Sequence, residues 1–287
     1  MKDAVVLGAT SLIGHFLLPR LVDGGYRVAA VSRSCPPPQK GIDWIELDAS
    51  QDAYPFTGTE TLISLAPIWV LATLLQRSRT PPGRIIAFSS TSAVSKQQSP
   101  NPTERRTAEK LLRGEALVRN QAERSSTAWT ILRPTMVYGA GLDKNVTTIA
   151  GFIERFGFFP LVGEASGLRS PVHAEDLATS VLRCLATPTS ENRLYTVTGG
   201  EEITYRTMVA RIFAGLGRRE RVLSIPNAGA KAALRLASLL PRYAELTPEM
   251  ADRANVDLVF NDSDARRDFG HAPRPFHPHR EDLLRAG

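Results

Sequence analysis

One glycine-rich stretch constrains this chain more than any other. It joins an apolar run, residues 4–7, to an amphipathic segment, residues 13–22, and it reads Gly8-Ala9-Thr10-Ser11-Leu12-Ile13-Gly14. An apolar strand, a tight glycine turn and a helix N-terminus together form a cradle for an anion, because the free helix amides and the helix dipole attract negative charge. The order of these parts predicts a βα turn that holds the pyrophosphate of a dinucleotide.

The turn departs from the usual pattern at its centre. Glycine at position 8 lets the chain turn sharply, and glycine at position 14 lets the helix pack closely on the sheet. A third glycine usually stands where Ser11 stands here, so a Cβ narrows the approach to the phosphates while the hydroxyl can donate to them. We expect a dinucleotide to contact the residues of this turn: Gly8, Thr10, Ser11, Leu12, Ile13 and Gly14.

Short apolar runs alternate with helical patterns through the first half of the chain. The strand patterns lie at residues 4–7, 27–32, 44–47, 61–65, 84–89 and 130–132. Such βαβ alternation predicts a parallel sheet with helices on both faces and a ligand at the carboxyl ends of the strands. The predicted fold class is therefore α/β, with a doubly wound parallel Rossmann sheet.

The alternation stops after Gly139, where helical patterns with irregular connections take over. A helix at 176–185 and a strand at 194–197 continue the earlier pattern. We therefore expect a dinucleotide-binding Rossmann domain of residues 1–140 plus 171–199. A smaller, mostly helical C-terminal substrate domain would comprise residues 141–170 plus 200–287.

Length and composition indicate a globular cytoplasmic protein. The chain has 287 residues with 43% hydrophobic content, no leader pattern and no apolar run of membrane-spanning length. Its most apolar late segment, residues 228–240, is interrupted by Lys231 and Arg235. Cys35 and Cys184 lie far apart in sequence, which argues against a disulfide framework and a metal knuckle.

Positive charge is concentrated in one region. The net charge is +6, and residues 77–133 contain eleven basic and four acidic residues. This excess could attract an anionic partner, but no aromatic residues interleave with it as a nucleic-acid platform requires, so a solvated helix face is the simpler interpretation. We expect a small-molecule substrate and neither nucleic acid nor membrane as a partner.

The end of the second strand bears on the choice of dinucleotide. An acidic residue there accepts from the ribose 2′-hydroxyl of NAD, whereas an arginine meets the 2′-phosphate of NADP. This chain has Ser32 and Arg33 at that place, which favours NADP over NAD, unless Arg33 is only a solvated loop residue. Asp48, after the third strand, suits the adenine amino group, and a turn or helix-capping role explains it as well.

Several motifs together resemble the short-chain dehydrogenase/reductase superfamily, in its extended branch of nucleotide-sugar epimerases and dehydratases. They are the turn at 8–14, Leu65-Ala66, Phe88-Ser89-Ser90-Thr91, the run from Leu132 to Gly139 and the run from Arg169 to Ala178. The resemblance implies cofactor-binding positions at Leu65, Ala66, Pro67, Pro134 and Val137. It places Thr91 at the catalytic Ser/Thr position and Arg169, with Asn145, among the substrate-binding positions; it also implies a homodimer through the helix that begins near Thr103.

The catalytic pair of that superfamily is missing. Its members use a Tyr-x-x-x-Lys pair on the helix after the fifth strand, in which the tyrosine moves a proton and the lysine lowers its pKa. No tyrosine of this chain has a lysine four residues later. If Lys110 is the lysine, Arg106 stands in the tyrosine position; if Glu115 sets the helix register, Thr107 and Leu111 occupy the two positions. The chain therefore resembles the atypical members.

Other residues are candidates for the missing chemistry. Thr91 or Ser90 can orient a carbonyl, Tyr138 can supply a phenol, and Lys110 or Arg106 can hold a ribose or stabilise an oxyanion. Each has a structural alternative: a turn hydrogen bond, a core aromatic or a solvated cation.

Three acidic or histidine features have structural explanations. Glu115 falls on the apolar stripe of its helix and needs a hydrogen-bonding or ionic partner. His173 with Asp176 resembles a base and its orienting acid, although Asp176 is better explained as a first-turn helix acid. The His277-Pro278-His279 run lacks other ligands nearby, so no metal site is assigned.

Two hypotheses follow. In the first, the protein is an NADP-dependent oxidoreductase, related to epimerases, that acts on a hydroxyl or keto group of a small, phosphorylated or nucleotide-linked molecule. In the second, it is a non-catalytic NADP-binding regulatory or structural module. The missing Tyr-Lys pair motivates the second.

Overall fold

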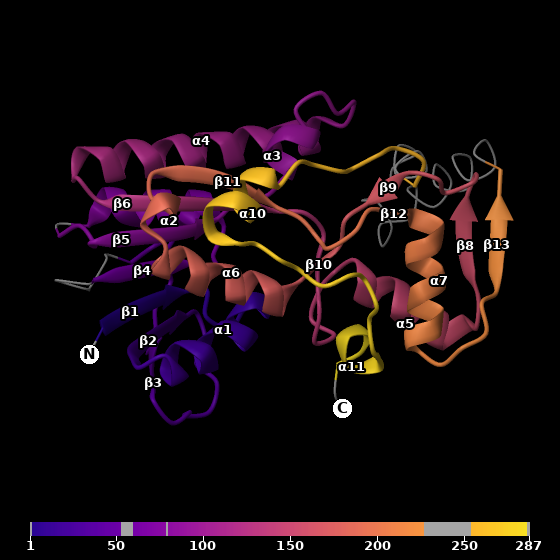
Figure 1. The fold of residues 1–287 in the computed structure, drawn as a ribbon, viewed down its shortest axis with the longest axis horizontal. Coiled ribbons are helices and arrows are strands. Elements are labelled where there is room, and N and C mark those ends of the chain that lie inside the picture. Colours follow the sequence, from indigo (N-terminus) through magenta and orange to yellow (C-terminus); the bar gives the residue numbers. More distant parts are fainter. Residues whose placement is uncertain (1, 53–59, 79, 227–253, 286–287) are drawn as a thin grey trace. The chain divides into compact units, whose positions relative to one another are not determined.

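In the computed structural model, seven strands form one sheet in which every neighbouring pair is parallel (Figure 1). Their order is β11-β6-β5-β4-β1-β2-β3, so the order reverses at β1 and β4. The strands are β1 (Lys2–Leu7), β2 (Tyr26–Ser32), β3 (Ile42–Glu46), β4 (Thr61–Ser64), β5 (Arg84–Phe88), β6 (Ala128–Pro134) and β11 (Arg193–Val197). This order is that of a doubly wound dinucleotide-binding sheet, and it confirms the predicted fold class.

The structure describes residues 2–52, 60–78, 80–226 and 254–285. It divides into two units. The first, called the sheet unit below, comprises Met1–Thr135, Ala174–Val197 and Asn261–Pro273; the second unit comprises Met136–His173, Thr198–Phe260 and Arg274–Gly287. Residues 228–240, the apolar segment noted in the sequence, lie outside the described residues.

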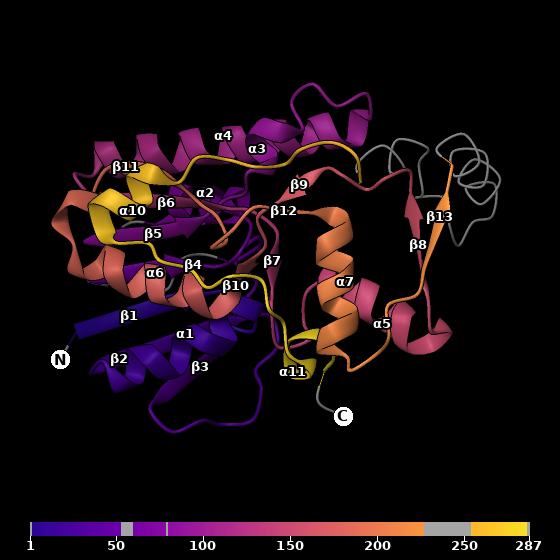
Figure 2. The same ribbon diagram turned by 45° about the vertical axis from the view of Figure 1, so that its right-hand side comes forward.

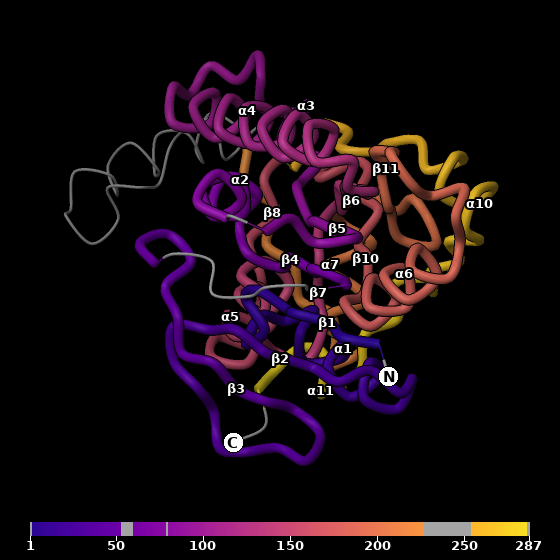
Figure 3. Tube along the Cα trace, turned by 90° about the vertical axis from the view of Figure 1, so that its left-hand side faces the viewer, coloured from indigo at the N-terminus to yellow at the C-terminus, as the bar shows by residue number. Residues whose placement is uncertain are grey.

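Helices cover both faces of the sheet (Figure 3). On one face lie α1 (Leu12–Asp23) and α6 (Ala174–Ala186), and on the other lie α2 (Ile68–Arg77) and α4 (Pro102–Arg124), with the short α3 (Ser92–Ser95) beside α4. The start of α4 is encoded locally: Pro102 occupies its first position and the Asn101 side chain accepts from the Thr103 amide at 2.9 Å.

A glycine allows α2 and α4 to approach closely. A Cβ on Gly114 of α4 would lie 2.9 Å from Ile68 Cγ2 and 3.0 Å from the Trp69 amide nitrogen. Real Cβ contacts are rarely this short, so a side chain at position 114 would force the two helices apart.

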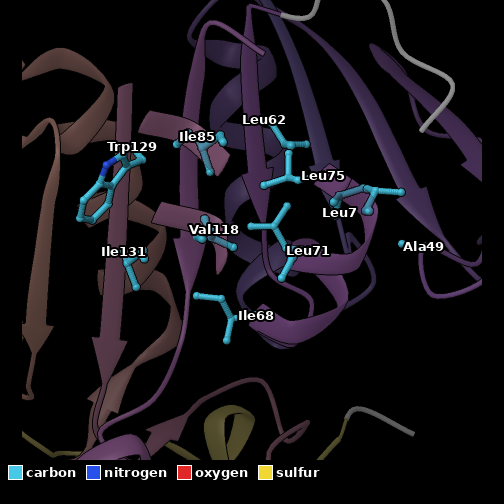
Figure 4. Close-up of a cluster of buried hydrophobic side chains, with 14 of the residues drawn as sticks. Leu7, Ala49, Leu62, Ile68, Leu71, Leu75, Ile85, Val118, Trp129 and Ile131 are labelled. Atoms are coloured by element: carbon cyan, nitrogen blue, oxygen red, sulfur yellow. The ribbon is translucent and has the colours of Figure 1, made fainter. Parts of the chain in front are cut away.

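Apolar side chains of the sheet, α2 and α4 form the core of this face (Figure 4). Leu62 and Ile85 from the strands meet Leu71 and Leu75 from α2 and Val118 from α4, and none of the five is more than 3% exposed. Burying each such side chain stabilises the fold by roughly 1.5–3 kcal/mol before entropy is counted, so α2 and α4 are held mainly by this face.

A late segment of the chain returns to the sheet unit. In Asn261–Pro273, the helix α10 (Ser263–Phe269) packs beside β11. The Tyr195 ring meets Phe269 edge to face at 5.1 Å, and its hydroxyl donates to Asp268 Oδ2 at 2.8 Å. The sequence predicts residues 200–287 in the second domain, whereas these contacts join Asn261–Pro273 to the sheet unit.

The second unit contains helices α5 (Val146–Phe156), α7 (Tyr205–Gly215) and α11 (Arg280–Leu283) (Figure 2). Its described residues also form three two-stranded sheets. The pairs are β7 (Val137–Tyr138) with β10 (Val172–His173), β9 (Leu168–Arg169) with β12 (Ile203–Thr204), and β8 (Phe159–Val162) with β13 (Val222–Ile225). The irregular connections of the sequence therefore include short strands. In the sheet unit, a 3₁₀ turn, Pro188–Ser190, lies between α6 and β11.

Substituting Gly114 tests the α2–α4 contact. We expect Gly114→Ala to lower the free energy of unfolding by about 1–3 kcal/mol through overpacking. The matched control is Gly151→Ala, in the interior of α5, where an added Cβ meets nothing within 4 Å. This control should gain about 0.5–1 kcal/mol, as alanine does over glycine in a helix. Urea denaturation measures both, and a Gly114→Ala protein at least as stable as the parent would contradict the proposed packing.

Candidate functional site

The glycine-rich turn lies between β1 and α1, at the reversal of strand order. Gly8 has a φ of +69°, and a Cβ on it would lie 2.8 Å from the Ala66 amide nitrogen. A Cβ on Gly14 would lie 2.0 Å from the Ala9 carbonyl oxygen. Both glycines are therefore required sterically. Gly8 adopts a left-handed conformation beside the segment that follows β4, and Gly14 allows α1 to pack against the backbone of Ala9.

Ser11 is the N-cap of α1. Its hydroxyl oxygen accepts from the Gly14 amide at 3.2 Å, and its own proton remains available for donation. The amides of Leu12 and Ile13, in the first helical turn, have no intrahelical acceptor because of helix geometry. No acidic residue lies in that first turn. The turn thus presents amide and hydroxyl donors in a positive field, which suits an anion.

The end of β2 is tied to this turn. Thr10 Oγ1 and Ser32 Oγ lie 2.9 Å apart, and the Ala9 amide donates to the Val31 carbonyl at 3.1 Å. Ser32 is buried at 8% exposure, whereas Arg33, the next residue, is exposed. Sheets of this class often carry a carboxylate here that binds the ribose. In this chain β2 ends in Ser32, whose hydroxyl is hydrogen-bonded with Thr10, and the exposed Arg33 follows it.

Asp48 has a turn role in the structure. Its carboxylate accepts from the Ser50 hydroxyl at 2.6 Å and from the Ser50 amide at 2.9 Å. Hydrogen bonds from Ser50 lower the pKa of Asp48, and the nearby charge of Arg33 adds to the effect. The contact with adenine, which the sequence also allowed, stays a prediction.

The remaining cofactor positions of the sheet unit follow strand ends. Leu65, Ala66 and Pro67 connect β4 to α2; the Leu65 amide donates to the Leu7 carbonyl at 2.9 Å, and Pro67 is the N-cap residue of α2. Pro134 ends β6. These positions lie at the carboxyl ends of parallel strands, the edge at which such sheets bind ligands.

Two of the three hydroxyl groups after β5 donate to protein acceptors. Thr91 donates to the Pro134 carbonyl at 3.1 Å, and Ser89 donates to Glu115 Oε1 at 2.5 Å. Ser90 Oγ accepts from the Ser92 amide at 3.1 Å, which leaves its own proton for another acceptor. Thr91 therefore has the turn role that the sequence allowed as an alternative.

Glu115 holds α4 to the ends of β5 and β6. The Arg133 guanidinium binds its carboxylate with two nitrogens, Nε at 2.8 Å from Oε1 and Nη2 on Oε2, and Ser89 completes the cluster. Glu115 is 5% exposed. The required partner is therefore Arg133, to which the sequence assigned no role. The available signal was an arginine directly after the strand predicted at 130–132, together with a carboxylate on the apolar stripe of a helix.

Residues one and two helical turns before Glu115 lie on the same side of α4 as Glu115. Leu111, one helical turn earlier, is buried in the core, and Thr107, two turns earlier, donates from its hydroxyl to the Thr103 carbonyl at 2.9 Å. Lys110 and Arg106 are exposed. Leu111 and Thr107 thus lie one and two turns before Glu115 on α4, and the choice between the two registers stays a prediction.

In the second unit, Tyr138 belongs to an aromatic core. Its ring is 1% exposed and meets His173 at 5.0 Å and Phe276 at 4.8 Å, both edge to face. Val137 precedes it on β7 and is partly exposed. Tyr138 is therefore a buried core aromatic, which the sequence allowed as the alternative to a catalytic phenol.

His173 pairs with an acid far away in sequence. Its Nε2 lies 3.0 Å from Asp282 Oδ1, while Asp176 lies in the first turn of α6, as expected. Burial alone would raise the pKa of Asp282, but hydrogen bonds from His173 and the His279 amide outweigh it and lower that pKa. Asp282 is a residue that sequence reasoning missed, because nothing local connects positions 109 residues apart.

The two predicted substrate residues differ in environment. Arg169 is 3% exposed, donates through Nη1 to the Leu168 and Val256 carbonyls at 2.7 Å each, and stacks over Tyr205 at 5.5 Å. Asn145 is exposed at the start of α5.

The described ranges contain no group of three or more His, Cys, Asp or Glu side chains that could hold a metal ion. Within the same ranges, no helix combines the length and the apolar character needed to cross a membrane.

A doubly wound parallel sheet with a glycine turn at its strand-order reversal defines the dinucleotide-binding class of α/β proteins. Residues 56–198 match the model of the NAD dependent epimerase/dehydratase family. The chain belongs to that family.

Among known proteins, the chain is 30% identical to the NAD(P)H azoreductase of Xenophilus azovorans over 139 residues, 48% of this chain and 46% of that protein. It is 26% identical to the UDP-glucose 4-epimerase of Vibrio cholerae over 105 residues, 37% and 32% of the two chains. These matches span less than half of the relatives' own lengths.

A solved structure shares the fold over nearly the whole chain. The UDP-glucuronic acid 4-epimerase of Bacillus cereus, in complex with UDP-glucuronic acid and NAD, superposes with a TM-score of 0.69 at 16% identity. The similarity covers 96% of this chain and 95% of that one.

The Glu115 cluster has a measurable role in stability. Glu115→Gln would leave the Arg133 guanidinium largely buried without a counter-charge, which costs about 3–5 kcal/mol in comparable pairs. We expect chemical denaturation to show a loss of that size. Glu109→Gln, an exposed position on the same helix, is the control and should change stability by less than about 0.5 kcal/mol. Equal stability of the two variants would show that the pair does not hold α4.

Proposed function

We propose that the sheet unit binds a nicotinamide dinucleotide, NADP in preference to NAD, and that the protein is an oxidoreductase acting on a hydroxyl or keto group of a small molecule. Membership of a family described as NAD dependent supports the cofactor class. The solved relative that binds NAD has the same fold. The bound nicotinamide would supply or accept a hydride at its C4 carbon.

The β1–α1 turn carries this proposal. Gly8 and Gly14 lie where a Cβ would collide with backbone atoms, so the turn can assume the tight form that dinucleotide sites require. Ser11, Leu12 and Ile13 would hold the pyrophosphate through one hydroxyl and two amides. The residues present therefore fit a dinucleotide, and Ser11 replaces the usual glycine without blocking the cap.

The preference for NADP rests on the end of β2. Arg33 is exposed and next to Ser32, and the Ser32 hydroxyl is engaged with Thr10. An arginine at this place suits a 2′-phosphate, and no carboxylate stands there for a free 2′-hydroxyl.

The alternative function is a non-catalytic NADP-binding module with a regulatory or structural role. One observation supports it: Glu115 is buried on α4 and paired with Arg133, and if Glu115 sets the register, Thr107 and Leu111 stand in the positions of the catalytic tyrosine and lysine. Candidate groups that remain for catalysis are Ser90, Thr91, Tyr138 and Lys110, of which Thr91 and Tyr138 have structural roles as well.

Cofactor choice can be tested by titration. We expect Arg33→Ala to weaken NADP binding at least tenfold relative to NAD, because a charge-assisted contact to phosphate is worth about 1.5–3 kcal/mol. Arg27→Ala is the matched control: Arg27 lies on β2, the strand that Arg33 directly follows, and pairs with Asp3 at 2.7 Å. Calorimetry gives both affinities, and an unchanged NADP:NAD ratio in Arg33→Ala would remove the assignment.

An assay of turnover distinguishes the oxidoreductase from the non-catalytic NADP-binding module. Purified protein would be screened with NADPH and keto-sugars or simple carbonyls. Tight NADPH binding without turnover, together with a co-purifying protein, would favour the module. Turnover lost in a Thr91→Ala, Tyr138→Phe double variant that still binds NADPH would favour the enzyme.

A nucleotide-linked substrate is proposed from Arg169. Its guanidinium would bind a diphosphate, as its position in the extended branch implies. We expect Arg169→Ala to weaken a nucleoside-diphosphate ligand by more than tenfold. Arg206→Ala, which removes a partly exposed arginine of the same unit, serves as control and should leave the affinity unchanged. Equal binding by parent and Arg169→Ala proteins would exclude the role.

A further inference from the structure

Exposed aromatic side chains gather on the second unit, where α5 ends and β8 begins (Figure 2). Phe156 is 50% exposed and Phe158 is 36% exposed. The partly exposed Phe152 joins them: its ring centroid lies 4.6 Å from that of Phe156 and 5.7 Å from that of Phe158. Single exposed apolar side chains are ordinary, but a contiguous group of them marks a surface that binds a partner.

The pairing of β8 with β13 extends this group. Phe159 and Val222 are register partners, and both pack against the core of the unit. Because side chains alternate along a strand, Phe158 and Leu223, each one position away, face the opposite side. Leu223 is 54% exposed, so the outer face of the two strands continues the apolar surface. The name apolar patch is used below for Phe152, Phe156, Phe158 and Leu223.

Two arginines border the apolar patch. The guanidinium of Arg155 lies over the Phe156 ring, 5.2 Å from its centroid, and Arg155 is exposed. The Phe159 amide donates to the Arg221 carbonyl at 2.9 Å, which places the exposed Arg221 beside Phe158 at the start of the strand pair. Cations therefore stand next to exposed hydrocarbon on both sides of the turn into β8.

The surrounding residues add positive charge. Residues 154–162 and 217–226 contain four arginines and two glutamates. One of these glutamates, Glu154, pairs with Arg218 and with Arg280, each at 3.0 Å. The excess of arginine makes the local potential positive, which suits an anionic partner.

The possible occupants of such a surface have different requirements. In a symmetric contact between two copies, the same arginines would meet, and like charges oppose that contact. A protein partner is recognised through hydrogen bonds as well as apolar area, whereas the four side chains of the apolar patch are pure hydrocarbon. An anionic lipid layer needs only apolar side chains that enter its interface and cations that meet its phosphate groups.

We propose that the apolar patch, with Arg155 and Arg221, docks the second unit onto an anionic phospholipid surface. No apolar run of the sequence has membrane-spanning length, which predicts no membrane partner. That pattern does not register a patch assembled from α5, β8 and β13. Contact with a lipid surface needs no spanning segment, because the side chains enter only the headgroup boundary.

The apolar contribution is tested by co-sedimentation of the 287-residue protein with phosphatidylcholine vesicles that contain about 30% phosphatidylserine. We expect the Phe156→Ser, Phe158→Ser double variant to bind these vesicles at least about tenfold more weakly than the parent, because it removes apolar area from the interface. Trp69→Ser is the matched control: it removes a 38% exposed apolar side chain from α2, in the sheet unit, and should leave binding unchanged.

The charge contribution is tested in the parent and in a second variant. Binding to the mixed vesicles should be at least about tenfold tighter than binding to pure phosphatidylcholine, and it should weaken as salt rises from about 0.1 to 0.5 M, because salt screens the arginines. Arg155→Gln with Arg221→Gln should lose about tenfold on mixed vesicles and show a smaller salt effect. Arg119→Gln, an exposed arginine of α4, should behave as the parent does.

Urea denaturation of each variant confirms that the substitution leaves the fold intact, and the comparison of the two vesicle types needs no variant at all. Absence of binding, or equal binding to both vesicle types, would overturn the proposal. Sedimentation velocity without vesicles examines the rival occupant. A dimer that the Phe156→Ser, Phe158→Ser variant dissociates, in a protein that binds no vesicles, would assign the apolar patch to a second copy instead.

Discussion

Close backbone contact at the centre of the sheet determines the rest of this structure. Gly8 turns with positive φ against the Ala66 backbone, and Gly14 brings α1 onto the Ala9 carbonyl. These contacts occur where strand order reverses between β1 and β4, so they place a helix N-terminus at the edge where doubly wound sheets bind ligands. Ser11 caps that helix and keeps a proton to donate, which makes the turn suitable for an anion despite the missing third glycine.

A second constraint lies at the other half of the sheet. The carboxylate of Glu115 joins α4 to the ends of β5 and β6 through Ser89 and Arg133. Glu115 needs these partners because an unpaired charge on the buried face of a helix would destabilise the folded state. This interaction also fixes the position of Leu111 and Thr107, which lie one and two turns earlier on the same helix. The same interaction thus stabilises the fold by holding α4 at the ends of β5 and β6.

Local sequence patterns predicted the parts of the molecule that local physics determines. Apolar runs gave the strands of the parallel sheet, and glycine spacing gave the β1–α1 turn, because period and backbone freedom are properties of neighbouring residues. Long-range partners were beyond that reasoning. The need of Glu115 for a partner was predicted, but Arg133 became its partner only through the strand order, and Asp282 reaches His173 from the end of the chain. The return of α10 to β11 depends on Tyr195 and Phe269 in the same way.

The central claim is that a nicotinamide dinucleotide lies on the β1–α1 turn of a site that lacks the Tyr-x-x-x-Lys pair. A crystal structure of the NADP⁺ complex tests it most directly. The account predicts pyrophosphate oxygens within hydrogen-bond distance of the Leu12 and Ile13 amides, the 2′-phosphate beside Arg33, and a serine or threonine hydroxyl as the side-chain donor from β5, α4 and β6 near the nicotinamide C4. A pyrophosphate bound away from the turn would contradict the account, as would a lysine of α4 in contact with the nicotinamide ribose.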